Sequence, residues 1–443
     1  MIQPPAGEGT PSASRYGSPA YSWYVVILLA AVYACHSMDR GMAGILVEPL
    51  RHEFNLNDKQ LGLFTGLAFG LSFSLAVLPM GYIADRVNRR NLLALIVLLW
   101  SGMTALGGLT RNFGQLVAMR LAVGASEAGA APLALPMLSD IFPANKRAFA
   151  LGVFYTSSPI GGFLAAIIGA TVAANYGWRA ALVVAGAPGI LLAVLLFLTV
   201  REPKRGGSDG AVTAAKPPGM LEGFRFLIKA PAVFCLMCAC ALMGLLNITI
   251  GVWTMSFFMR VHDVPLAQAS LILGIGGGLI GMMSPPAMGW LADRLTLRNV
   301  RWPLRLVALA ALGSFALTLV MLFTPSLIVA IATFVVADFL RHGYTPPTYS
   351  VLMTSTPAHM RGSVMSILQL MTNLVGFGLG PFITGALSDY YGGGTAIRYA
   401  LANAAFVFLI VVALLLLASR LIYGPRKAAA QPQPQARPRS ETA

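Results

Sequence analysis

The chain has 443 residues, of which 57% are hydrophobic and only 11% are charged, and its formal net charge is +15. A mean hydropathy of +0.72 excludes an ordinary soluble domain. Apolar runs of about 20 residues, enough to cross the hydrocarbon core of a bilayer, recur along the chain and predict an all-α membrane protein that crosses the bilayer many times.

Residues 1–21 are polar and rich in Pro, Gly and Ser, and we expect a disordered cytoplasmic tail. No small-residue cleavage site follows the first apolar run, which indicates a retained helix and not a signal peptide. We predict twelve transmembrane helices, with boundaries set by charged or Pro/Gly breaks. They cover 22–45, 60–84, 91–110, 115–138, 148–173, 179–200, 232–260, 266–291, 303–323, 326–352, 362–387 and 396–420.

The longest polar connection, 201–231, contains "REPKRGGSDGAVTAAKPPG" and divides the spans into two sets of six. We therefore expect an N-terminal bundle over 22–200, a cytoplasmic linker over 201–231 and a C-terminal bundle over 232–420. Residues 421–443 are expected to form a second disordered cytoplasmic tail.

The distribution of Lys and Arg predicts the orientation. With a cytoplasmic N-terminus, the cytoplasmic segments hold 22 of the 31 basic residues and the opposite loops hold 6, while Arg40, Arg120 and Arg341 lie inside spans. This bias places both termini in the cytoplasm, in the plasma (inner) membrane. The positive net charge then follows from topology and contact with membrane lipid, so it gives no reason to expect a nucleic-acid partner.

An internal repeat supports two similar halves. "PMGYIADRVNRRN" at 79–91 and "AMGWLADRLTLRN" at 287–299 share seven of thirteen residues and lie at the cytoplasmic end of the second helix of each half. Two similar six-helix halves are the architecture of an alternating-access transporter, whose substrate site lies between the halves near the midplane.

The first span carries three ionisable residues, His36, Asp39 and Arg40, within "YACHSMDRGMAG". A charge at the bilayer centre costs about 2.5–3.5 kcal/mol on insertion scales, so these groups must pair with one another or line water. The fourth helix offers partners, because Arg120 and Glu127 lie seven residues apart on one helical face.

A helix rises about 1.5 Å per residue, so position in the chain gives the depth of each residue in the bilayer. These depths predict two layers of ionisable residues. Asp39 and Arg40 lie at the level of Arg120, and His36 lies at the level of Glu127, near the midplane. One interpretation of the Asp39–Arg120 pair is a static clamp between helices. The other is proton coupling, because competition between burial and nearby arginines would let protonation of Glu127 depend on conformation. His36 is either a buried neutral histidine or a proton relay.

The loop motif in the first repeat has two interpretations. Gly81, Asp85 and Arg86, with Arg89 and Arg90, form a cytoplasmic gate motif, and Asp293 and Arg294 are its second copy. An acidic residue does not help to set the membrane orientation, so topology does not explain Asp85. We predict that it latches the two halves in the outward-open state. Arg89 and Arg90 are also explained by positive-inside anchoring alone.

The tenth helix contains "VVADFLRHGYTPPTYS", in which Asp338 lies three residues before Arg341. The two form either a self-neutralised pair or a site where Arg341 meets an anionic head group. Four further residues are candidates for a substrate cavity: Tyr155, Thr156, Asn247 and Trp253.

The four cysteines, Cys35, Cys235, Cys238 and Cys240, lie in apolar runs and are read as buried side chains. "GIGGGLIG" at 274–281 lies in an apolar helix with no preceding strand, so helix packing explains its glycines better than dinucleotide binding. No Gly-Lys dipeptide occurs, so the sequence has no Walker A motif for binding ATP. A membrane-embedded enzyme or a channel is a further alternative, but the five histidines show no metal-ligand spacing. We expect no cofactor, no metal and no enzymatic activity.

"GYIADRVNRR" at 81–90 resembles the loop signature of the major facilitator superfamily, with Asn88 at a position where that family usually has glycine. "RLAVG" at 120–124 is similar to its fourth-helix motif. "SMDRGMAGIL", "RLAVGASEAGAAPLALPMLSDIFPANKRAFALGVFYTSSPIGG" and "REPKRG" together resemble the spinster group of lipid transporters. This resemblance implies that Asp39, Arg40, Arg120 and Glu127 carry proton coupling and substrate-dependent switching.

We therefore expect a proton-coupled secondary transporter of an amphipathic anion, of lysophospholipid or sphingoid type, acting as a monomer. Its partners would be the small-molecule or lipid substrate, protons and membrane lipid. Organic-anion:proton symporters of the same superfamily carry similar charges, so a sugar acid or carboxylate substrate is the alternative.

Overall fold

The computed structural model describes residues 18–84, 86–203 and 220–424, and these residues form helices and connections without strands. In the N-terminal half the helices are α1 (Pro19–Ile45), α2 (Val47–Phe54), α3 (Asp58–Gly62), α4 (Ala68–Ala84), α5 (Arg89–Gly107), α6 (Phe113–Glu127), α7 (Ala130–Ile141), α8 (Ala144–Leu164) and α9 (Ala170–Thr199). Short π-helical turns join α3 to α4, at Leu63–Leu67, and α8 to α9, at Ala165–Gly169.

The C-terminal half follows the same plan. Its helices are α10 (Met220–Lys229), α11 (Pro231–Val261), α12 (Leu266–Leu273), α13 (Gly281–Thr296), α14 (Trp302–Phe323), α15 (Leu327–His342), α16 (Thr345–Ser355), α17 (Arg361–Met371), α18 (Gly380–Tyr390), α19 (Ile397–Ala405) and α20 (Val407–Ile422). π-Helical segments η3 (Gly274–Ile280) and η5 (Thr372–Leu379) interrupt two of the spans. Helix α10 was not foreseen, because it lies within the connection read as linker.

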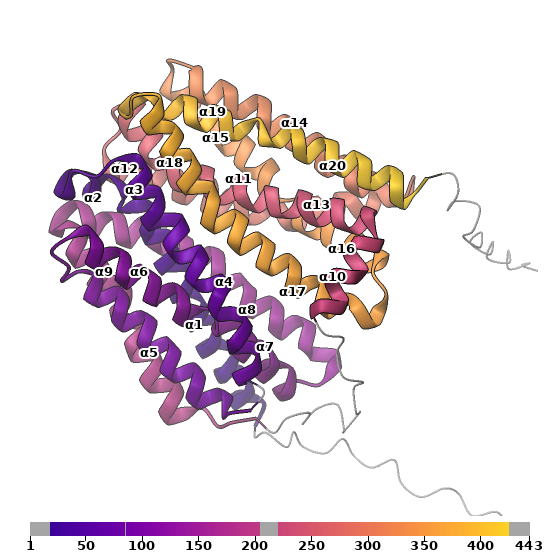
Figure 1. Ribbon diagram of the computed structural model, residues 1–443. Coiled ribbons are helices and arrows are strands. Elements are labelled where there is room, and N and C mark those ends of the chain that lie inside the picture. The colour runs from indigo at the N-terminus through magenta and orange to yellow at the C-terminus, as the bar shows by residue number, and fades with distance from the viewer. Residues whose placement is uncertain (1–17, 85, 204–219, 425–443) are drawn as a thin grey trace, which may run out of the picture.

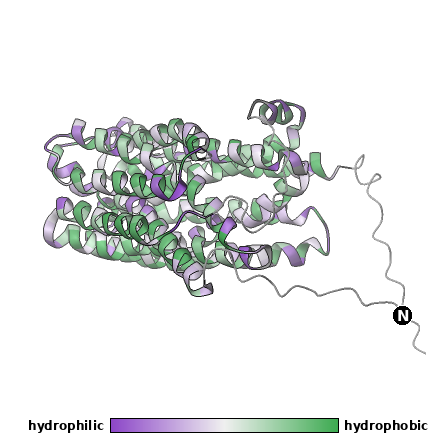
Figure 2. Cartoon of the chain, turned by 90° about the horizontal axis from the view of Figure 1, so that it is seen from below, coloured by the Kyte–Doolittle hydropathy of each residue, from purple (hydrophilic) through white to green (hydrophobic). Residues whose placement is uncertain are grey.

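Eleven helical stretches of the described chain are long and apolar enough to cross a membrane. One of them, Phe149–Thr199, runs for 51 residues and covers two predicted spans. Gly177 separates the two, since its φ of 84° lies in the left-handed region that only glycine enters readily. The all-α fold of twelve transmembrane helices is confirmed, and hydrophobic residues, green in Figure 2, run along the helices.

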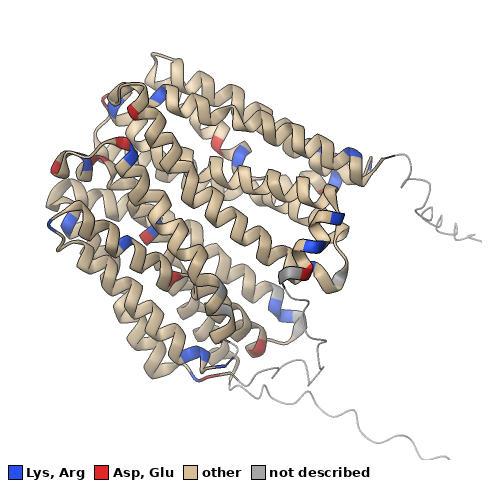
Figure 3. Ribbon diagram, in the orientation of Figure 1, with Lys and Arg blue, Asp and Glu red and all other residues tan. Residues whose placement is uncertain are grey.

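The two halves lie side by side, coloured indigo to magenta and red to yellow in Figure 1. Helix α1 begins and α20 ends at the same end of the molecule, which we call the terminal end. The other end carries α2, α3 and the connections 262–265 and 391–396, and we call it the distal end. Most charged residues of the described chain lie toward the helix ends, with small groups inside α1, α6 and α15 (Figure 3).

Three clusters of buried apolar residues form the core. One is built from the N-terminal half and one from the C-terminal half. The third joins both halves toward the distal end, where Met42 and Trp178 share a cluster with Trp253 and Phe257. The halves are therefore held together by a continuous apolar core at one end.

Glycines allow this junction to be close. A Cβ placed on Gly70 of α4 would lie 2.5 Å from the backbone nitrogen of Gly378 and 2.6 Å from its Cα. One placed on Gly66 would lie 2.8 Å from the carbonyl oxygen of Phe377. Backbone atoms cannot give way as a flexible side chain can, so α4 and η5 approach to a distance that larger residues forbid.

Gly70→Ala should therefore force the halves apart locally. Overpacking of this kind costs about 1–3 kcal/mol, so we expect a lower apparent melting temperature of the purified protein. The matched control is Gly251→Ala in α11, where no heavy atom lies within 4 Å of the added Cβ. Equal melting temperatures for the two variants would contradict the close-approach argument.

Candidate functional site

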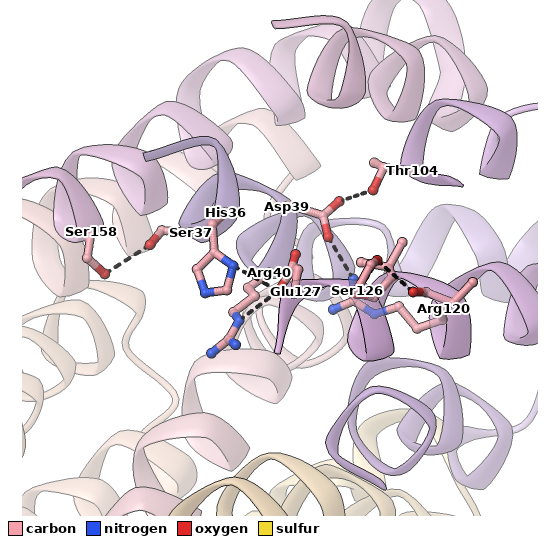
Figure 4. A network of polar contacts seen from close by, with 11 residues as sticks. His36, Ser37, Asp39, Arg40, Thr104, Arg120, Ser126, Glu127 and Ser158 are labelled. Carbon is pink, nitrogen blue, oxygen red and sulfur yellow. Dashed lines mark hydrogen bonds and ion pairs between the residues drawn. The ribbon is translucent and has the colours of Figure 1, made fainter. Parts of the chain in front are cut away.

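Helices α1, α5 and α6 bury a first ion pair. The Asp39 carboxylate accepts a hydrogen bond from Arg120 at 3.1 Å through one oxygen and from the Thr104 hydroxyl at 2.7 Å through the other. Asp39 is 4% exposed and Arg120 is 7% exposed. Both carboxylate oxygens have partners, so this pair neutralises its charges within the bundle (Figure 4).

The second cluster is centred on Glu127, the last residue of α6, about two helical turns beyond Arg120. Its Oε2 lies 3.0 Å from His36 Nδ1 and accepts a hydrogen bond from Arg40 Nε at 3.2 Å. Glu127 is 1% exposed, and its Oε1 has no hydrogen-bond partner among the described residues. This carboxylate thus has one oxygen bound by cationic or polar groups and one oxygen available (Figure 4).

The placement of Arg40 differs from the predicted layers. Depth along the helix put Arg40 level with Asp39 and Arg120, but its guanidinium contacts Glu127 in the other layer. Side chains on a helix lean toward its N-terminus, and α1 runs from the terminal end. The long Arg40 side chain therefore reaches back toward the level of His36, while the short Asp39 side chain stays at its own level.

A small cavity adjoins the first pair. It has a volume of about 20 Å³ and is lined by Asp39, Thr104 and Arg120 together with apolar side chains such as Phe64 and Met103. This is room for about one water molecule beside polar groups. Gly124, between the two charged residues of α6, faces α4, where its Cβ would lie 2.8 Å from the Phe69 carbonyl oxygen.

In the C-terminal half, Arg341 forms an ion pair with Asp338 on the same helix and is 2% exposed. Its guanidinium also donates to the carbonyl oxygens of Leu246 at 3.0 Å and Asn247 at 3.3 Å. His342 Nδ1 lies 3.0 Å from Asp338 Oδ2. Because Arg341 is engaged on several sides, the arrangement favours the self-neutralised pair over contact with an anionic head group.

The four residues predicted to line a substrate cavity have different environments. Tyr155 is 49% exposed and Thr156 is exposed on α8, while Asn247 is partly buried and its Oδ1 has no partner among the described residues. Trp253 corrects the prediction, because it is fully buried and its indole N–H donates to the Pro381 carbonyl at 3.0 Å. This side chain packs α11 against α18 instead of facing a cavity.

The gate motif is described in part. Asp85 lies outside the described residues, and Gly81 lies in α4. Arg86 is exposed over the Tyr82 ring at 3.3 Å. In the second copy Arg294 lies over Trp290 at 4.0 Å, and Asp293 is exposed.

Arg89 of the gate motif is buried and ties its own half together. It pairs with Asp140 at 2.8 Å, at the end of α7, and with Glu202 at 3.1 Å, after α9. The backbone N–H of Arg90 donates to the same Glu202 carboxylate at 2.8 Å. These contacts join three elements of the N-terminal half at the terminal end, which neither interpretation of Arg89 and Arg90 foresaw.

A set of ionic contacts at the distal end was missed. Arg260, at the end of α11, pairs with Glu48 at 2.7 Å and Asp58 at 2.8 Å in the other half. The Asp389 carboxylate accepts hydrogen bonds from the backbone N–H groups of Asp58 at 2.9 Å and Lys59 at 2.7 Å. We call these five residues the distal seal. No role was predicted for Arg260 from the sequence, and no local pattern links positions this far apart in the chain.

A family model described as Major Facilitator Superfamily matches residues 29–377 and 286–442. An MFS-type efflux pump of Mycolicibacterium smegmatis is 27% identical over 393 residues, which cover 88% of this chain and 89% of that protein. The sphingosine-1-phosphate transporter SPNS2 of Danio rerio is 26% identical over 378 residues, 80% of this chain and 73% of that protein.

The fold is similar to the crystal structure of a bacterial homologue of the human lysosomal transporter Spinster in an inward-facing, unoccupied conformation. The two share 28% sequence identity with a TM-score of 0.82, and the match covers 91% of this chain and 98% of that one.

The first ion pair can be tested by a double-variant cycle. Arg120→Met leaves the Asp39 carboxylate buried without its counter-charge, so we expect a loss of about 3–5 kcal/mol, measured as a fall in melting temperature. Adding Asp39→Asn should restore most of the loss, because the amide is neutral and can still accept from Thr104.

Arg179→Met is the matched control for this cycle. Arg179 pairs with Glu53 at 2.6 Å with both side chains about 40% exposed, so its loss should cost less than about 1 kcal/mol. A double variant no more stable than Arg120→Met alone would show that the ion pair is not the source of the effect.

Proposed function

The chain belongs to the major facilitator superfamily, and from this premise we propose that it is a proton-coupled secondary transporter of an amphipathic, lipid-like anion that works by alternating access. It is an integral, multi-pass membrane protein, and its relatives are transporters and not enzymes. We further propose the plasma (inner) membrane as its location, with both termini in the cytoplasm, and a monomeric state.

One observation carries the proton coupling: Glu127 is a buried carboxylate with one oxygen bound by His36 and Arg40 and one oxygen without a partner. A free charge is costly inside the bilayer, so the state of Glu127 depends on whether those two side chains stay in place. A displacement of either side chain would change that balance and exchange a proton. Asp39 is held on both oxygens, and it serves as the second protonatable group in this proposal.

Alternating access is supported by the distal seal. Arg260 is nearly buried between two carboxylates of the other half, and Asp389 accepts hydrogen bonds from two backbone N–H groups at the N-terminus of α3. These contacts must break for a rocking motion to open the distal end. The conformation described here is therefore closed distally, and we infer access from the terminal end.

The substrate class rests on the relatives. One of them is a transporter of sphingosine-1-phosphate, a lipid with an anionic head group. In this chain Arg40 offers a cation with 19% of its side chain exposed. A guanidinium suits phosphate or carboxylate, so we propose that Arg40 contacts the head group. The paired Arg341 has a structural role.

We expect Glu127→Gln to abolish coupling to the proton gradient. In proteoliposomes, a pH gradient should drive movement of a labelled anionic lysolipid, lysophosphatidic acid, by the wild-type protein, and the variant should show only the movement seen without a gradient. The control is Glu53→Gln, at an exposed carboxylate whose pKa a hydrogen bond from Arg179 holds below its usual value. A full response by Glu127→Gln would rule out its proton role. Transport of a sugar acid such as glucuronate, without lysolipid movement, would favour the alternative substrate class.

Arg260→Gln should weaken the distal seal, because it leaves Glu48 and Asp58 buried without a counter-charge. Spin labels at the exposed positions 52 and 395, on opposite halves of the distal end, should report a larger population of long distances. The chain would carry His52→Cys and Thr395→Cys in a background with its four native cysteines replaced by alanine. Arg111→Gln, an exposed distal arginine, is the control. Unchanged distances in Arg260→Gln would contradict the role of the seal.

A further inference from the structure

The guanidinium of Arg40 lies among three phenylalanine rings. Its Cζ is 4.8 Å from the centroid of Phe69 and 5.0 Å from that of Phe73, both on α4. The third ring, Phe377, is 4.7 Å away and belongs to η5 in the other half. A cation over an aromatic face is attracted to it, most strongly where water is excluded. Arg40 is therefore bound by both halves at once.

Phe377 is held in place by the closest approach between the halves. Its carbonyl oxygen packs on Gly66 and the next residue, Gly378, packs on Gly70. Among the described residues packed against the core cluster of the N-terminal half, Phe377 is the one that comes from the C-terminal half. The π-helical backbone of η5 at this point is a feature often found at functional sites. The ring position thus depends on the distal end being closed.

We propose that Phe377 is a positioning residue that links closure of the distal end to proton binding at Glu127. This inference rests on the proposed function and adds the residue through which the C-terminal half acts. With the distal end closed, Phe377 helps to hold Arg40 against the Glu127 carboxylate. When the halves rock apart, the ring leaves with its own half and Arg40 loses one of its three aromatic contacts.

The energetic link runs in both directions. If opening weakens the hold on Arg40, it makes Glu127 easier to protonate, and protonation of Glu127 must favour opening by the same factor. The other ionisable groups that face Glu127 are Tyr33, His36 and Asp39 of α1 and Arg120 of α6. All of them belong to the N-terminal half, so movement of the C-terminal half does not carry any of them away from Glu127.

The test is the pH dependence of distal opening, measured with the spin-label pair at positions 52 and 395. In the wild-type chain the ratio of long to short distances should change with pH. Phe377→Leu keeps an apolar side chain but removes the aromatic face, and the change in that ratio over the same pH range should shrink by about fivefold or more. Phe377→Tyr keeps the face and should retain the wild-type response.

Phe73→Leu is the matched control. It removes a ring that contacts Arg40 from its own half, and rocking of the halves as rigid bodies would leave this contact in place. The pH dependence of opening should therefore survive in Phe73→Leu. Melting temperatures of all the variants check that each is folded.

The outcomes separate this inference from the proposed function. A wild-type pH response in Phe377→Leu, together with loss of the response in Glu127→Gln, would overturn the role of Phe377 alone. Equal loss in Phe377→Leu and Phe377→Tyr would assign the ring to packing and also overturn it. If Glu127→Gln itself keeps the response, the proposed proton site is wrong, whatever Phe377 does.

Discussion

The need to neutralise charge inside hydrocarbon organises the N-terminal half. Asp39, Arg40, Arg120 and Glu127 are carried by only two helices, α1 and α6, and each makes an ionic contact with the other helix. An unpaired charge at this depth would cost several kilocalories per mole, so the relative position of the two helices is set by these pairs. The rest of the half packs around that constraint, with Thr104 of α5 completing the coordination of Asp39.

The carboxylates of Asp39 and Glu127 differ in how many of their oxygens are bound and in which half their partners contact. Asp39 is held through both oxygens by a hydroxyl and a guanidinium that belong to the same half, so neither of these contacts spans the two halves. Glu127 is held through one oxygen, and its partner Arg40 also contacts a ring of the opposite half. A contact that spans the two halves is the kind that a rocking motion alters.

The junction between the halves combines two kinds of packing. At the distal end, in the distal seal, Arg260 pairs with Asp58, and Asp389 accepts a hydrogen bond from the Asp58 backbone. Deeper in the bundle, Gly70 lets α4 lie against the backbone of η5 with little side chain between them. A buried ion pair adds little net stability once its desolvation is counted, and glycines let the helices approach closely without interlocking side chains. Together they give a junction that is closed but reversible.

Hydropathy, loop charge and the repeated "ADR" segments are local properties, and for that reason the twelve helices and the division into halves could be derived from the sequence. The ionisable residues of the first and fourth helices were also evident, because a charge in an apolar run has few explanations. Helical depth along the chain brought Asp39 to Arg120, but it failed for Arg40, whose side chain is long enough to reach another layer.

Only the tertiary structure decided which distant residues meet. The distal seal joins residues 48, 58, 260 and 389, and the Arg40 cation meets Phe377 across the two halves. Trp253, taken as a cavity residue, is buried between helices. Periodicity shows which face of a helix is apolar, but not which helix covers it. Pairing between halves depends on the geometry of the whole bundle, which no local pattern records.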